Sequence, residues 1–95
     1  MSETDALFAN RIRTGILAWL SDRGEGDFTE VARVMGLANN TLSSHLRRLE
    51  DAGYIDLHRG FLGRKPRTRI LMTARGRTAW LTYLDSFQDD RATDR

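Results

Sequence analysis

The chain has 95 residues, with 15 basic and 13 acidic side chains and no cysteine. This length predicts one small domain, and the lack of cysteine excludes disulfides, thiolate metal sites and thiol redox switches. We expect a cytoplasmic protein with no membrane partner, because we find neither an apolar run of roughly 20 residues nor an N-terminal signal peptide.

The formal net charge is only +2, but the cations are unevenly distributed along the chain. Residues 38–77 carry nine basic and three acidic side chains, a local charge of +6, whereas the remaining residues carry six basic and ten acidic ones, a charge of −4. A basic middle between acidic ends can orient a molecule toward a polyanion. The alternative interpretation is an ordinary solvated surface rich in arginine.

The N-terminal part of the chain predicts two helices. Apolar residues from Leu7 to Leu20 recur at helical spacing and form a broad buried stripe. A turn is expected over residues 21–26, where two glycines can adopt positive φ angles. Thr29 is placed to cap a short helix over residues 30–35. Gly36 is placed to end that helix in the left-handed conformation.

A third helix is predicted from about Asn40 to Ala52, with an asparagine at its N-terminus suited to capping it. Leucines at positions 42, 46 and 49 follow the spacing i, i+4, i+7 and define its buried side. The remaining positions carry short hydrogen-bonding side chains toward the N-terminus and arginines toward the C-terminus. This helix therefore presents an uncharged polar surface that becomes cationic along its length.

The second half of the chain predicts a β-hairpin followed by a last helix. Residues 54–58 and 68–72 are the two strands, and residues 61–66 are the loop between them. Thr73 can cap a helix from residue 74 to about 88. The predicted order is therefore helix–helix–helix–strand–strand–helix, a mainly α fold with a small β-hairpin (α+β).

Taken in order, six segments of the chain resemble the winged helix-turn-helix regulators of bacteria and archaea, and most closely the small single-domain regulators of the MarR and ArsR neighbourhood. These segments are TEVA (29–32), GL (36–37), LSSHL (42–46), LEDAGYI (49–55), GRKPRT (63–68) and TARGR (73–77). The resemblance covers about residues 11–84. It implies one winged-helix DNA-binding domain over residues 1–95, with flexible ends at 1–5 and 89–95.

In this architecture the second motif helix, residues 40–52, lies in the major groove, and the wing, residues 59–69, contacts the minor groove or phosphates. We therefore expect ten side chains to bind DNA: Asn39, Asn40, Thr41, Ser43, Ser44, Arg47, Arg48, Arg64, Lys65 and Arg67. Short side chains near a helix N-terminus can reach base edges, and long cations can reach bases or phosphates. The alternatives are that the asparagines only cap the helix and that the wing is an edge hairpin kept soluble by charge.

The resemblance implies a sequence-specific transcriptional regulator of double-stranded DNA, with repression as its simplest action. Related proteins use terminal helices for dimerisation, so we predict a homodimer with an apolar interface made by Leu7, Phe8, Trp80, Leu84 and Phe87. The same residues could instead be ordinary core. An alternative function is a winged-helix protein–protein interaction module, which the basic wing disfavours.

Enzymatic and metal functions find no support in the residues. We find no Ser/His/Asp set, phosphate-binding glycine loop or paired catalytic carboxylates, so we expect no enzyme and no cofactor. His45 and His58 are far apart and have no cysteine partner, which makes a poor metal site. His45 should lie at the margin of the core, with a structural hydrogen bond or a phosphate contact. Any small-molecule effector is left undefined.

Overall fold

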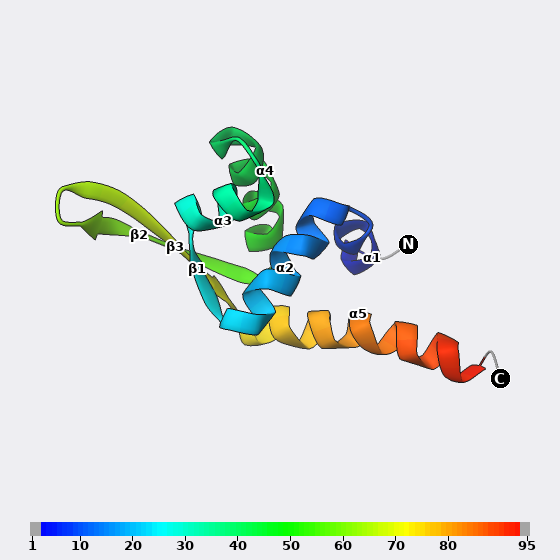
Figure 1. The fold of residues 1–95 in the computed structure, drawn as a ribbon. Coiled ribbons are helices and arrows are strands. Elements are labelled where there is room, and N and C mark those ends of the chain that lie inside the picture. Colours follow the sequence, from blue (N-terminus) through cyan, green and yellow to red (C-terminus); the bar gives the residue numbers. More distant parts are fainter. Residues whose placement is uncertain (1–2, 94–95) are drawn as a thin grey trace.

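A computed structural model describes the backbone of residues 3–93 and the side chains of residues 6–87. In chain order these residues form α1 (Glu3–Phe8), α2 (Arg11–Arg23), β1 (Glu25–Asp27), α3 (Phe28–Met35), α4 (Asn39–Asp51), β2 (Ile55–Leu62), β3 (Lys65–Met72) and α5 (Ala74–Thr93) (Figure 1). Strand β3 lies between β1 and β2 in an antiparallel sheet. The mainly helical fold with a small sheet confirms the predicted fold class.

The predicted helix over residues 7–20 is in fact two helices, α1 and α2, so the prediction of one continuous helix there is wrong. Helix α1 ends at Phe8, and Asn10 caps α2 by accepting a hydrogen bond from the Arg13 backbone N–H at 3.0 Å. The apolar pattern runs through the break because residues on both sides of it pack against the same core. Periodicity alone therefore did not reveal the boundary.

Strand β1 occupies the second half of the segment predicted as a turn over residues 21–26. Helix α2 continues to Arg23, and Gly24 then turns the chain with φ 85°. Gly26 is paired with Ile70 of β3, and its missing side chain leaves room for the ring of Trp19, which a Cβ at this position would overlap. A polar strand of three residues shows no alternation of apolar and polar side chains. It forms because the backbone of β3 supplies its hydrogen-bond partners.

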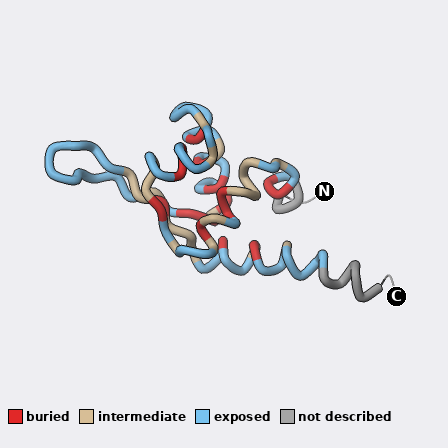
Figure 2. Tube along the Cα trace, viewed as in Figure 1, coloured by how far each residue is buried: buried red, intermediate tan, exposed pale blue. Residues whose placement is uncertain are grey.

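The β2–β3 hairpin is longer and tighter than predicted. The strands extend to Leu62 and resume at Lys65, leaving a two-residue turn of Gly63 and Arg64 in place of the expected loop over residues 61–66. Gly63 has φ 65°, which a tight turn requires of one residue. The outer half of the hairpin is exposed on both faces (Figure 2), so it carries no burial alternation that would have marked it as strand.

The two helices of the central motif begin at Phe28 and Asn39, earlier than the predicted starts at residue 30 and at about residue 40. The N-cap of α3 is Asp27 and not Thr29. The N-cap of α4 is Ala38, so neither Asn39 nor Asn40 caps that helix. The side chain of Asn40 instead accepts a hydrogen bond from the next backbone N–H. Gly36 ends α3 with φ 66° and ψ 37°, which confirms the left-handed cap.

The start of α5 is held against the junction between α4 and β2. Thr73 caps α5 by accepting from the Gly76 N–H at 2.9 Å, as predicted, and its hydroxyl donates to the Gly53 carbonyl at 2.6 Å. Its own N–H donates to the Tyr54 carbonyl at 3.0 Å. A Cβ at Gly76 would overlap that same carbonyl, so the helix can pack this closely only with glycine.

The core lies where the helices meet the inner ends of the strands, shown in red in Figure 2. Its fully buried side chains are Ile16, Leu17, Leu20, Val31, Leu42, Leu46, Leu49, Ile55 and Ile70. The molecule measures 57 × 23 × 22 Å, and the hairpin and α5 project at opposite ends (Figure 1). Helices α1 and α5 reach into the ends that we expected to be flexible, whereas residues 1–2 and 94–95 lie outside the described chain.

Candidate nucleic-acid interface

Helices α3 and α4 form the helix-turn-helix. Leu42, Leu46 and Leu49 are buried and anchor α4 to the body, which confirms the predicted inner face of that helix. The seven predicted DNA-contacting residues of α4 are all exposed: Asn39, Asn40, Thr41, Ser43, Ser44, Arg47 and Arg48. Among the described residues, neither arginine of this set forms an ion pair. The outer face of α4 is thus free to meet a ligand.

The five cations of the wing fall into two groups, those paired with a carboxylate and those without an ion pair among the described residues. Arg67 donates from Nε to Asp27 Oδ1 at 2.8 Å, and Arg69 pairs with Glu25, so two cations are neutralised by carboxylates of β1. The other three are Arg59, Arg64 and Lys65, which have no ion pair among the described residues. Of the predicted wing contacts, therefore, two have free charges and Arg67 does not.

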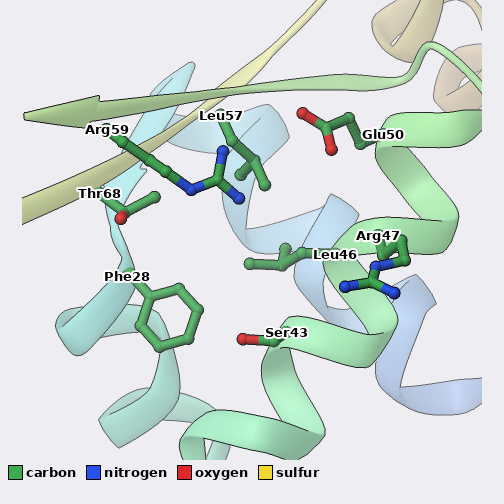
Figure 3. A pocket seen from close by; sticks show the side chains of 8 residues that line it. All are labelled: Phe28, Ser43, Leu46, Arg47, Glu50, Leu57, Arg59 and Thr68. Atoms are coloured by element: carbon green, nitrogen blue, oxygen red, sulfur yellow. The ribbon is translucent and has the colours of Figure 1, made fainter.

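A cavity of about 280 Å³ separates α4 from the hairpin. Its lining consists of Phe28, Ser43, Leu46, Arg47, Glu50, Leu57, Arg59 and Thr68, and Figure 3 shows these side chains converging from α4, the hairpin and the start of α3. Arg59 extends from β2 into this space toward α4. Its cation and that of Arg47 therefore lie at the same cleft between the motif helix and the wing.

Arg59 is absent from the contact residues predicted from the sequence, although the strand pattern around it indicates which way it faces. Side chains two apart on a strand share a face, so Arg59 must lie on the same side as the half-buried Leu57, toward α4. No local sequence pattern indicated that Asp27 and Glu25 would pair with Arg67 and Arg69. These two acidic residues belong to β1, whose pairing with β3 was not foreseen.

His45 links the inner side of α4 to the N-terminal helices. Its Nδ1 accepts a hydrogen bond from Arg13 Nη1 at 3.3 Å, and the same guanidinium donates to the carbonyls of Ala6 and Leu7 in the last turn of α1. Burial lowers the pKa of His45, and the nearby charges of Arg13 and Arg48 lower it further. His45 is therefore held neutral, as a structural link between α1, α2 and α4.

The predicted dimer residues separate into buried and exposed members. Leu7, Phe8 and Trp80 are each 7% exposed and belong to the core of the chain itself. Phe8 stacks on Tyr83 of α5 with ring centroids 4.4 Å apart. Leu84 and Phe87 are 41% and 47% exposed, and Leu81, also on α5, is 54% exposed. The homodimer stays a prediction, and its apolar surface is now confined to α5.

The described residues lack a metal-ligating cluster and a membrane-spanning helix. No group of three or more histidine, cysteine, aspartate or glutamate side chains there could hold a metal ion. None of the helices in that part of the chain combines the length and the apolar composition needed to cross a bilayer.

Comparison with known proteins places this fold in a family. Residues 12–89 match the family described as winged helix DNA-binding domain. An uncharacterized protein of Methanocaldococcus jannaschii is 27% identical over 78 residues, covering 82% of this chain and 85% of the relative. The structure of a transcriptional regulator homologue from Pyrococcus horikoshii OT3 superimposes with a TM-score of 0.79 at 26% identity, covering 98% of this chain and 97% of that one.

The crystal structure of an ArsR family transcriptional regulator is similar as well, with a TM-score of 0.68 at 25% identity, covering 92% of this chain and 90% of that one. These similarities agree with the helix-turn-helix and the wing described above. Because the family match extends over most of its length, this chain belongs to the family of winged helix DNA-binding domains.

Proposed function

We propose that this protein is a sequence-specific transcriptional regulator that acts in the cytoplasm as a dimeric repressor on double-stranded DNA. The observation that carries this proposal is the cleft between α4 and the wing. There, the exposed face of α4, which has no acidic residue from Asn39 to Leu49, stands beside Arg59, although Glu50 also lines the cleft. Arg64 and Lys65 lie farther along the wing, and none of these three wing cations has an ion-pair partner among the described residues. A polyanion with a groove fits both surfaces at once.

In the proposed complex α4 lies in the major groove. Its N-terminal side chains, including Asn40, Ser43 and Ser44, reach base edges, and Arg47 and Arg48 reach bases or phosphates. Serine hydroxyls and asparagine amides supply donors and acceptors that can read more than one base. Sequence preference therefore comes from the first two turns of α4.

The wing contacts the minor groove or the phosphates that flank it. Arg64 lies in the turn, Lys65 begins β3, and Arg59 faces the cleft, so all three can approach the same backbone as α4. Arg67 would have to leave Asp27 before it could contribute.

The salt dependence of binding should report the number of free cations. The five unpaired cations at this surface are Arg47, Arg48, Arg59, Arg64 and Lys65. If each neutralises one phosphate, the slope of log K against log salt should be roughly −4 to −5 per subunit.

The dimer is proposed to form through α5. Its outer part projects beyond the body of the molecule (Figure 1) and exposes Leu81, Leu84 and Phe87. A two-fold contact along this helix would cover the exposed apolar surface. To read a pseudo-palindrome, this dimer must place its two copies of α4 in successive major grooves, about 34 Å apart. Occupying a promoter in this way is the simplest route to repression.

Selection from a random pool of DNA duplexes tests the proposal. The bound sequences should converge on a two-fold motif, and fluorescence anisotropy with the selected duplex should give the salt slope stated above. Ser44→Ala should change the preferred sequence, whereas Lys65→Ala should weaken all sequences about equally and flatten the slope by about 1. Failure to bind any duplex at low salt would contradict the proposal and favour a protein-interaction module.

A further inference from the structure

The tip of the wing exposes two large apolar side chains. Phe61 is 73% exposed and Leu62 is 64% exposed, more than any other large apolar residue of the described chain. Phe61 is paired across the hairpin with Pro66, and Leu62 with Lys65. An edge hairpin kept soluble by charge would not need an aromatic ring in this position. The apolar tip therefore calls for a binding partner.

The register of the hairpin decides which way each side chain faces. Alternate residues of a strand share a face, and Leu57 and Arg59 of β2 both line the cleft toward α4, as does Thr68 of β3. Phe61 and Pro66 continue this face toward the tip of the hairpin. Leu62 lies on the opposite face. The aromatic ring thus belongs to the surface that α4 shares.

The charge around the tip identifies the kind of partner. No acidic residue occurs between Asp56 and Asp85. Arg59 precedes Phe61 by two positions on the same face of β2, Arg64 lies in the turn, and Lys65 is paired with Leu62. None of these three cations has an ion pair in the described part of the chain. An apolar group between unpaired cations suits the minor groove of DNA, where phosphates flank the base steps and apolar side chains can partly unstack them.

We propose that Phe61, supported by Pro66, is a wedge that enters the minor groove and partly unstacks one base step beneath the wing. This inference rests on the proposed DNA binding and adds a deformation of the duplex to it. A wedge of this kind bends DNA by about 20–90° toward the major groove. It also favours pyrimidine–purine steps such as TA and CA, because these unstack most easily. Part of the sequence preference then comes from how easily the base step under the wing unstacks, and not from hydrogen bonds to base edges.

The test compares Phe61→Ala with Leu62→Ala. Both variants remove an exposed apolar side chain from the same tip, so both should fold, but only the first loses the wedge. The probe is the duplex that the wild-type protein binds best in a random pool, with 2-aminopurine at the step beneath the wing. Binding is measured by anisotropy, bending by the gel mobility of circularly permuted fragments, and unstacking by 2-aminopurine fluorescence.

Wild-type protein should bend the duplex and raise the 2-aminopurine fluorescence. Phe61→Ala should abolish both effects and weaken binding by about tenfold, as expected for the loss of one aromatic–base contact, while Leu62→Ala behaves as wild type. Binding without bending, unchanged in Phe61→Ala, would overturn the wedge and leave DNA binding intact. Wild-type protein that binds no duplex would overturn both proposals. If Phe61→Ala instead alters sedimentation without DNA, the tip is a protein contact and the wedge is wrong.

Discussion

Replacing Asp27 with asparagine should release Arg67 for contact with DNA. In the structure Arg67 Nε lies 2.8 Å from Asp27 Oδ1, and the two side chains are 40% and 30% exposed. An ion pair at this exposure contributes only about 0–1 kcal/mol to folding. Asparagine also remains a good residue for the N-terminal boundary of α3, where Asp27 lies. The substitution should therefore leave the fold stable.

The gain in binding follows from one additional phosphate contact. Each contact adds about 0.9 to the magnitude of the salt slope. Between 50 and 200 mM salt, a fourfold range, the Asp27→Asn variant should therefore lose about 3.5-fold more affinity than wild type. At low salt it should bind more tightly. Asp22→Asn is the matched control, because it removes the same charge at the end of α2 without releasing a wing cation.

Fluorescence anisotropy titrations on one selected duplex, at four or more salt concentrations, provide the measurement. Arg67→Ala alone should leave the slope near the wild-type value, and the Asp27→Asn, Arg67→Ala double variant should match it. If Asp27→Asn leaves the slope unchanged, or Arg67→Ala flattens it by about 0.9, Arg67 already contacts phosphate and the ion pair does not withhold it.

Three further substitutions test the framework around the interface. Gly76→Ala should destabilise the protein by about 2 kcal/mol, because overlap with the Tyr54 carbonyl outweighs the higher helix propensity of alanine. The melting temperature should fall by about 8–16 °C, whereas Gly60→Ala, which points into open space, should leave it unchanged. The pKa of His45 is lowered from its ordinary value of 6.5 in the folded chain, so unfolding takes up a proton below that pH. The free energy of unfolding, measured with urea, should therefore keep the full contribution of His45 above pH 6.5 and lose it on acidification. His45→Gln should reduce this loss, and an unchanged pH profile would show that neither burial nor the charges of Arg13 and Arg48 lower the pKa of His45. Leu84→Glu should convert a dimer into a 10.9 kDa monomer in sedimentation experiments, and wild-type protein that is already monomeric would contradict the α5 interface.

Features set by near neighbours in the chain were predictable. The spacing of Leu42, Leu46 and Leu49 marked the buried side of α4, and the structure buries all three. Gly36 and Thr73 were recognised as helix-ending and helix-starting residues because their roles need only three or four adjacent residues. The outer surface of α4 followed from the same periodicity.

Features set by distant residues were not predictable from local patterns. Strand β1 has three polar residues and exists because β3 pairs with it. The hairpin extends to Leu62 without any burial signal, since its outer half packs on nothing within the described chain. Leu7, Phe8 and Trp80 have the composition of an interface, yet the fold uses them as core.

The sequence by itself determined that this protein has a polar helix face and a basic wing, because helical and strand periodicities are local properties of the chain. Only the tertiary structure decided which wing cations are available to a ligand. Asp27 and Arg67 are 40 residues apart, and the antiparallel pairing of β1 with β3 brings them together. An ion pair depends on distance in space, which local periodicity does not encode.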